Sequence, residues 1–197
     1  MALVDAAESA IALVDTQPGF VDHDLMDKDD RERAGATVDR IAWLLGLAGL
    51  MEIPVVAVEE DPDRNGHTEE RVAERLPAAT PIHVKDGYSF ASSAAAVEAL
   101  RNTLRKTIVV VGFETDVCVA QSALELLDLD FRVVACDDLS YTTTAYQHRH
   151  GMERMLHAGV EPNHLKGLLF EWFRTVARGD ALYREAVDKF GRPPVSG

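Results

Sequence analysis

Three residue types that could carry out covalent catalysis stand at or just after short apolar runs. Asp15 ends the run AIALVD, Lys85 ends the run IHVK, and Cys118 follows the run TIVVVG after a short turn. A thiolate is a strong nucleophile, whereas an ordinary thiol, with a pKa near ~8.5, is mostly protonated at neutral pH. A carboxylate could accept the thiol proton and later return it to a leaving amine, while an ammonium stabilises both anions. The three side chains therefore predict a cysteine nucleophile with a general base.

The segment VVVGFETDVCVAQSAL, residues 109–124, places Cys118 where a buried strand gives way to a helix. A helix N-terminus and a nearby ammonium both favour the thiolate, so we expect a lowered pKa for this thiol. Backbone N–H groups of the turn at 113–118 could stabilise an oxyanion. Taken alone, a cysteine is more often a small buried hydrophobic residue, and that remains the interpretation of Cys136.

The apolar runs alternate with segments that have the apolar spacing of helices. Strands are expected at 10–15, 55–58, 82–85, 107–112, 131–136 and, weakly, 160–163; helices are expected at 31–51, 68–76, 92–102, 117–130 and 143–158, with one or two more within 166–190. Such alternation of fully apolar strands with helices is typical of a parallel sheet covered on both faces. We predict one domain over 1–197, a three-layer α/β/α sandwich around a mostly parallel sheet of about six strands. Ligands bind at the carboxyl ends of strands in such sheets, where the three candidate residues lie.

The composition narrows the range of partners and locations. The net charge of −13 disfavours nucleic acid and anionic membranes as partners. The N-terminus lacks a basic region before an apolar core, and the longest apolar stretch, 41–51, is too short to span a bilayer. We therefore expect a cytoplasmic protein with a small-molecule substrate. The apolar segment 168–176 suggests core or a subunit interface, so a homo-oligomer is also expected.

Three blocks of the sequence resemble signature blocks of the isochorismatase-like cysteine hydrolase superfamily: ALVDTQPGFVD, VKDGYSFASS and GFETDVCVAQSALELLDLDFRVVACDD. The segment HRHGMERMLHAG is similar to the helix that follows in that family. The resemblance implies a catalytic triad of Asp15, Lys85 and Cys118. It also implies a cis peptide bond between Phe113 and Glu114 and an oxyanion hole made by the amides of Glu114 and Cys118. Family members that cleave isochorismate lack the cysteine, so the resemblance implies hydrolysis of a C–N bond in a small amide, carbamoyl or ureido compound.

Several side chains that follow the expected strands are candidates for substrate binding: Gln17, Phe20, Tyr88, Phe90, Phe113 and Glu114. The aromatic ones could wall a pocket or belong to the core. Nicotinamidases of the family carry an Asp-x-His metal motif after the second strand, where this chain has VEEDPDRNGHTEE. Asp61, Asp63 and His67 lack that pattern and do not provide a typical zinc ligand set, so no metal and no other cofactor is expected.

Two other functions stay open from the sequence. A non-catalytic member of the fold could bind a small molecule or act as a scaffold. A redox-active thiol protein could oxidise Cys118 reversibly if Cys136 lay close to it in space. Alkylation of Cys118 well before Cys136 would favour the hydrolase, and the sequence does not identify the substrate.

Overall fold

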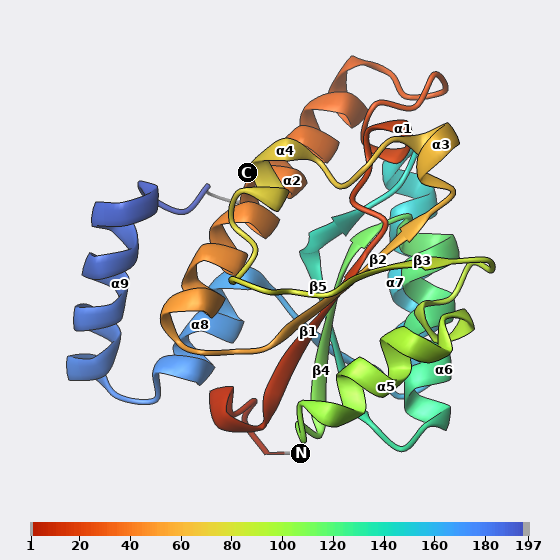
Figure 1. Cartoon of the computed structure of the whole chain (residues 1–197). Coiled ribbons are helices and arrows are strands. Elements are labelled where there is room, and N and C mark those ends of the chain that lie inside the picture. The colour runs from red at the N-terminus through yellow and green to blue at the C-terminus, as the bar shows by residue number, and fades with distance from the viewer. Residues whose placement is uncertain (1, 195–197) are drawn as a thin grey trace.

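The computed structural model describes residues 2–194, and within them six strands form a single parallel sheet (Figure 1). The strands are β1 (Ser9–Val14), β2 (Val55–Glu60), β3 (Ile82–Lys85), β4 (Thr107–Phe113), β5 (Arg132–Tyr141) and β6 (Glu161–Asn163). They are arranged in the order β3-β2-β1-β4-β5-β6. The predicted parallel sheet is confirmed, and its first four strands lie next to one another.

Helices cover both faces of the sheet, which confirms the predicted three layers. One face is covered by α2 (Lys28–Leu50), α8 (Leu165–Phe173) and α9 (Val176–Phe190), and the other by α5 (Ala94–Asn102), α6 (Ala120–Asp128) and α7 (Ala145–His157) (Figure 1). In β1, Ile11 and Leu13 belong to the first core and Ala10, Ala12 and Val14 to the second. Side chains of a strand point alternately to its two faces, so a strand covered on both sides must be apolar throughout.

Short helical segments complete the loops: η1 (Ala6–Glu8), α1 (Pro18–Val21), α3 (Pro62–Asn65), α4 (Glu70–Ala73), η2 (Phe90–Ser92) and the π-helix η3 (Thr115–Val119). Four of them, α1, α3, η2 and η3, come soon after the carboxyl ends of β1, β2, β3 and β4. These segments therefore surround the edge of the sheet at which the candidate residues were expected.

Several element boundaries differ from the prediction, and three of the differences have a clear structural cause or consequence. Helix α2 begins at Lys28, three residues before the expected start, because the Asp27 side chain caps it by accepting a hydrogen bond from the Asp30 amide. Strand β5 continues to Tyr141, which pairs with Phe113 after a register shift in β4. Strand β2 continues to Glu60, which brings a second glutamate to the edge of the sheet.

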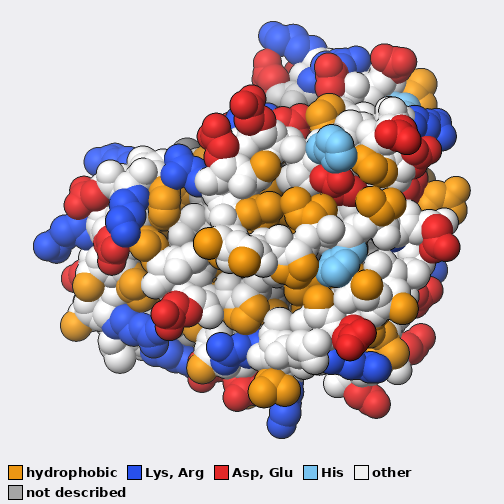
Figure 2. Space-filling view, viewed as in Figure 1, with side chains coloured by type: hydrophobic (Ala, Val, Ile, Leu, Met, Phe, Trp, Pro, Cys, Tyr) orange, Lys and Arg blue, Asp and Glu red, His pale blue; other side chains and the backbone are white. Residues whose placement is uncertain are grey.

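The surface is strongly charged. Figure 2 shows basic and acidic side chains on the visible face, with acidic ones gathered over α3 and the neighbouring loops. None of the helices in residues 2–194 is long and apolar enough to cross a membrane.

Candidate active site

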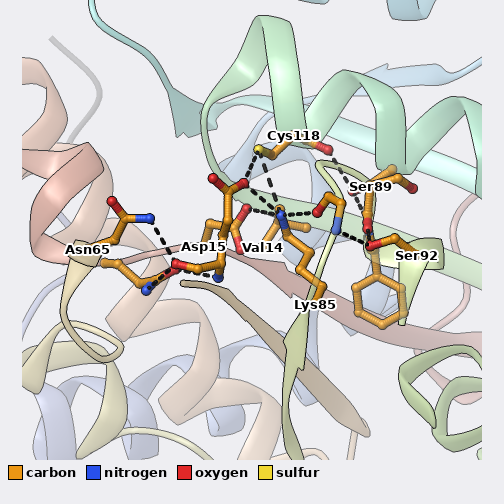
Figure 3. A network of polar contacts seen from close by, with 12 residues as sticks. Val14, Asp15, Asn65, Lys85, Ser89, Ser92 and Cys118 are labelled. Carbon is orange, nitrogen blue, oxygen red and sulfur yellow. Dashed lines mark hydrogen bonds and ion pairs between the residues drawn. The ribbon is translucent and has the colours of Figure 1, made fainter. Parts of the chain in front are cut away.

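The ends of three strands bring Asp15, Lys85 and Cys118 together. Asp15 follows β1, Lys85 ends β3, and Cys118 lies in η3 after β4. The Lys85 Nζ atom lies 2.9 Å from Asp15 Oδ2 and 3.9 Å from Cys118 Sγ (Figure 3). Asp15, Lys85 and Cys118 are 0%, 3% and 1% exposed, respectively. The sequence thus correctly predicted that these three side chains meet.

A glycine allows β4 to approach β1 at this point. A Cβ atom on Gly112, whose φ is +127°, would lie 1.9 Å from the Val14 carbonyl oxygen. Asp15 comes directly after this contact and has a φ of +44°, a left-handed conformation that aspartate tolerates better than most residues. Its amide donates to the Val58 carbonyl (3.1 Å), which fixes its position relative to β2. Close strand packing thus holds the carboxylate at the edge of the sheet.

The segment that carries Cys118 is held from two sides. A Cβ atom on Gly151 of α7 would lie 2.8 Å from the Asp116 Cα atom, so α7 packs directly on the backbone of η3. The Ser122 hydroxyl donates to the Cys118 carbonyl (2.6 Å) and accepts from the Phe90 amide (2.7 Å). These contacts fix the position of the cysteine between α7 and η2.

Burial dominates the electrostatics of the three side chains. Desolvation raises the pKa of Asp15 to about 7, although the charge of Lys85 opposes this shift. Burial is the largest single influence on the pKa of Lys85 and lowers it, but Asp15, Cys118 and Glu60 together outweigh burial, and the pKa is raised overall. Burial and the Asp15 carboxylate also raise the pKa of the Cys118 thiol, with Lys85 opposing them. The expected lowering of the thiol pKa is therefore wrong, because burial destabilises the thiolate more than the lysine and the helix N-terminus stabilise it.

Glu60 is a fourth ionisable residue at this point, and the sequence interpretation missed it. Its Oε2 atom lies 3.0 Å from Lys85 Nζ and 3.5 Å from Cys118 Sγ. The side chain is 23% exposed, so unlike the other three it reaches the surface. The rule that identifies Asp15 also applies to Glu60, but the predicted strand ends at Val58, two residues before Glu60.

Gln17 holds the backbone of Glu60. Its side-chain oxygen accepts from the Glu60 amide (2.8 Å), and its nitrogen donates to the carbonyls of Glu60 (3.1 Å) and Gly66. Asn65 also donates to the Glu60 carbonyl (2.8 Å). Both ends of the fully buried Gln17 amide are thus occupied by the protein. In this structure Gln17, a candidate for substrate binding, positions Glu60.

The four aromatic candidates lie in different surroundings. Phe90 and Phe113 are fully buried in the cores on opposite faces of the sheet. Phe20 is partly buried and packs against the core beside α2. Tyr88, 58% exposed, lines a cleft next to Lys85. Of the four, Tyr88 has the clearest access to a ligand, whereas Phe90 and Phe113 contribute packing.

Glu114 begins the turn that leads to Cys118. The peptide bond between Phe113 and Glu114 is cis. The Glu114 side chain accepts a hydrogen bond from the Thr143 hydroxyl (3.1 Å), and burial raises the pKa of its carboxyl group. The side chain is thus linked to β5 and its following loop through Thr143.

A cleft of about 560 Å³ lies beside the buried cluster and is lined by residues 60–63 and 84–88. It reaches Glu60 and Lys85, the two residues that contact the Cys118 sulfur. A larger groove, of about 1480 Å³, is lined by parts of α2, α8 and α9 and by none of these residues. Proximity to the cysteine rather than size identifies the smaller cleft as the access to the candidate site.

The potential metal-ligand atoms of the cluster surround the Lys85 ammonium. Asp15, Glu60 and Cys118 each offer one potential metal-ligand atom, and these atoms lie within 4.8 Å of one another. The Lys85 ammonium contacts all three side chains. His67, one of the residues weighed for a metal, instead pairs with Glu59 (3.0 Å).

Comparison with known proteins identifies the family of the chain. The family model of the isochorismatase domain matches residues 9–164. The chain belongs to the isochorismatase family. This family consists largely of hydrolases, and the match includes the three strand ends that carry Asp15, Lys85 and Cys118.

Relatives in other organisms extend the comparison. The secreted isochorismatase effector Isc1 of Phytophthora sojae is 28% identical over 131 residues, which are 65% of this chain and 62% of that protein. The MAR1 ribonuclease from Caenorhabditis elegans superposes with a TM-score of 0.80 at 20% identity over 100% of both chains. The octameric YcaC gene product of Escherichia coli, a hydrolase of unknown specificity, superposes with a TM-score of 0.79 at 22% identity over 96% of this chain and 93% of its own. At 20% and 22% identity, the likeness to these two solved structures establishes the fold alone.

Proposed function

We propose that the protein is a cysteine hydrolase that cleaves a C–N bond in a small amide, carbamoyl or ureido compound. The observation that carries the proposal is the buried contact of Lys85 with both Asp15, at 2.9 Å, and the Cys118 sulfur, at 3.9 Å. Membership of a family of hydrolases supports it. A nucleophile, a base and a cation in one place are the groups that acyl transfer requires.

In the proposed reaction, Asp15 accepts the proton of the Cys118 thiol while the sulfur attacks the carbonyl carbon. The backbone N–H groups of Glu114 and Cys118 would stabilise the oxyanion. Protonated Asp15 then gives its proton to the departing nitrogen, the C–N bond breaks, and a thioester remains on Cys118. A water molecule, deprotonated by Asp15, attacks the thioester, which releases the acid and restores the thiol.

The pKa shifts suit a general base better than a preformed thiolate. An Asp15 pKa of about 7 lies near neutral pH, where a general base is both available and effective. Among residues 2–194, the Asp15 oxygens have no hydrogen bond of ordinary geometry, although Oδ2 is at ion-pair distance from Lys85. The carboxylate therefore has lone pairs with which to accept the thiol proton.

The test uses a panel of small amides, carbamoyl compounds and ureido compounds with the wild-type protein and two matched variants. Cys118→Ala should abolish turnover without unfolding the protein, whereas Cys136→Ser should keep it because Cys136 is buried within the sheet core. Mass spectrometry of a quenched reaction should find the acyl group on Cys118. Turnover that survives in Cys118→Ala would contradict the mechanism, and no turnover of any compound would favour a non-catalytic binding or scaffold protein.

Assembly and location are part of the same proposal. We propose a homo-oligomer, in line with the octameric state of the E. coli neighbour, and a cytoplasmic location, although the relative Isc1 is by its name secreted. The ribonuclease activity named for the C. elegans neighbour is not carried over. A net charge of −13 repels a polyanion such as RNA.

A further inference from the structure

The cleft beside Lys85 and Glu60 is acidic. Four of its lining residues carry carboxyl groups: Glu60, Asp61, Asp63 and Asp86. Its cationic lining residue, Lys85, is already paired with Asp15 and Glu60. A ligand in this cleft therefore meets an excess of negative charge, which attracts cations and repels anions.

Of the four carboxylates that line the cleft, Glu60 is the one that contacts the Cys118 sulfur. Its Oε2 atom contacts both Lys85 and the Cys118 sulfur, whereas within residues 2–194 its Oε1 atom has no hydrogen-bond partner. The side chain is partly exposed, and Gln17 and Asn65 hold its backbone at three hydrogen bonds. Oε1 is thus an acceptor left free on a held side chain that lines the cleft, and fixed charges bind with little loss of entropy.

We propose that Glu60 determines substrate specificity by binding a cationic nitrogen, an ammonium or guanidinium group, that the substrate carries close to the carbonyl that is cleaved. The inference rests on the proposed function and names the substrate class of that site. The 3.5 Å between Oε2 and the sulfur places the bound cation only a few atoms from the carbon that the sulfur attacks. A carboxylate forms its strongest hydrogen bonds with such cations.

Substrates with a carboxylate in the same position are excluded by the same geometry. Lys85 does not offset this effect, because its ammonium already contacts two carboxylates and the Gly87 carbonyl (2.8 Å). An anionic substituent would therefore meet Glu60 without a free cation to pair with. Selectivity comes from repulsion as well as attraction.

Charge-matched thiol reagents test the inference without knowledge of the substrate. Methanethiosulfonates with 2-aminoethyl, 2-sulfonatoethyl and methyl groups carry a positive, a negative and no charge. Each transfers its thioalkyl group to the attacking sulfur as a mixed disulfide and releases methanesulfinate. The rate of modification of Cys118 is measured by intact mass at pH 7 in a Cys136→Ser background, so that one thiol reports.

In the protein that keeps Glu60, Cys118 should react at least about 100-fold faster with the cationic than with the anionic reagent at low salt. Glu60→Gln should reduce this ratio of the cationic to the anionic rate about tenfold, and added salt should reduce it further. Glu98→Gln is the matched control: Glu98 is exposed on α5 and outside the cleft lining, so its ratio should not change. Glu60→Asp, which keeps the charge, should retain the preference and provides a second variant if Glu60→Gln fails to fold.

Three outcomes overturn the inference alone. A ratio near one, a faster anionic reagent, or a ratio that Glu60→Gln leaves unchanged would each remove the role of Glu60 while leaving a reactive Cys118 and the proposed hydrolase intact. Failure of the neutral reagent to modify Cys118 would overturn the proposed function and this inference together. In the hydrolysis assay, β-alaninamide should have a higher kcat/KM than propionamide, and succinamate a lower one.

Discussion

The ionisation of Asp15 should control the reactivity of Cys118, and alkylation by iodoacetamide in a Cys136→Ser background measures it. With a pKa of about 7, the Asp15 carboxylate is about 10% ionised at pH 6 and about 90% at pH 8. Base-assisted alkylation should therefore rise about tenfold over this range and level off above pH 8. A free thiol with a pKa of about 8.5 and no base would instead rise about 75-fold, without levelling off.

Asp15→Asn removes the base while it keeps the shape of the side chain. The rate at pH 7 should fall by a factor of about 100 or more, the usual contribution of a positioned general base. The remaining reaction should follow the ionisation of the thiol, whose pKa burial raises, and should increase steadily with pH. If the wild type and Asp15→Asn gave the same profile, Asp15 would not be the base, and the proposed mechanism would fail.

Further predictions concern stability and the positioning of the site. Because burial raises the pKa of Asp15 from 3.8 to about 7, the folded protein should lose up to roughly 4 kcal/mol of stability as the pH rises through this window. Urea titrations at several pH values should show no such loss of stability in Asp15→Asn. Gly112→Ala should lower the free energy of unfolding by roughly 3 kcal/mol or more, because its Cβ would overlap the Val14 carbonyl. Gly159→Ala, also at positive φ but with open space around it, should lower it by about 1 kcal/mol. Thermal unfolding compares the two variants, and equal losses of stability would contradict the packing argument. Gly151→Ala should lower kcat/KM at least about tenfold by displacing η3, while Gly35→Ala, which meets nothing within 4 Å, should leave kcat/KM unchanged.

The arrangement of the fold was accessible from the sequence because the strands are apolar on both faces. The bounds expected for β3, 82–85, agree with the structure, and the position of Asp15, Lys85 and Cys118 at one edge followed from the rule for parallel sheets. This rule needs only the approximate end of each strand. It therefore tolerates errors of one or two residues in the boundaries.

Properties that depend on burial were not accessible in this way. The sequence shows a lysine and a helix start near Cys118, both of which favour a thiolate, but it does not show that the site is closed to water. The role of Gln17 depends on β2 lying beside the loop after β1, which brings the Glu60 backbone within reach of its amide. Phe90 and Tyr88 differ by two positions in a short irregular segment, where no periodicity indicates which one faces the core.

The place of β3 at the edge of the sheet has a consequence for how the protein loses activity. In the described part of the chain, 2–194, this strand spans four residues, pairs with β2 alone, and leaves Ile82 and Val84 exposed, yet it carries Lys85. Short, exposed segments open locally at a lower free energy than the core of a fold. Detachment of β3 would withdraw the ammonium from Asp15 and Cys118 while β1 and β4 stay paired, so inactivation on warming can precede global unfolding.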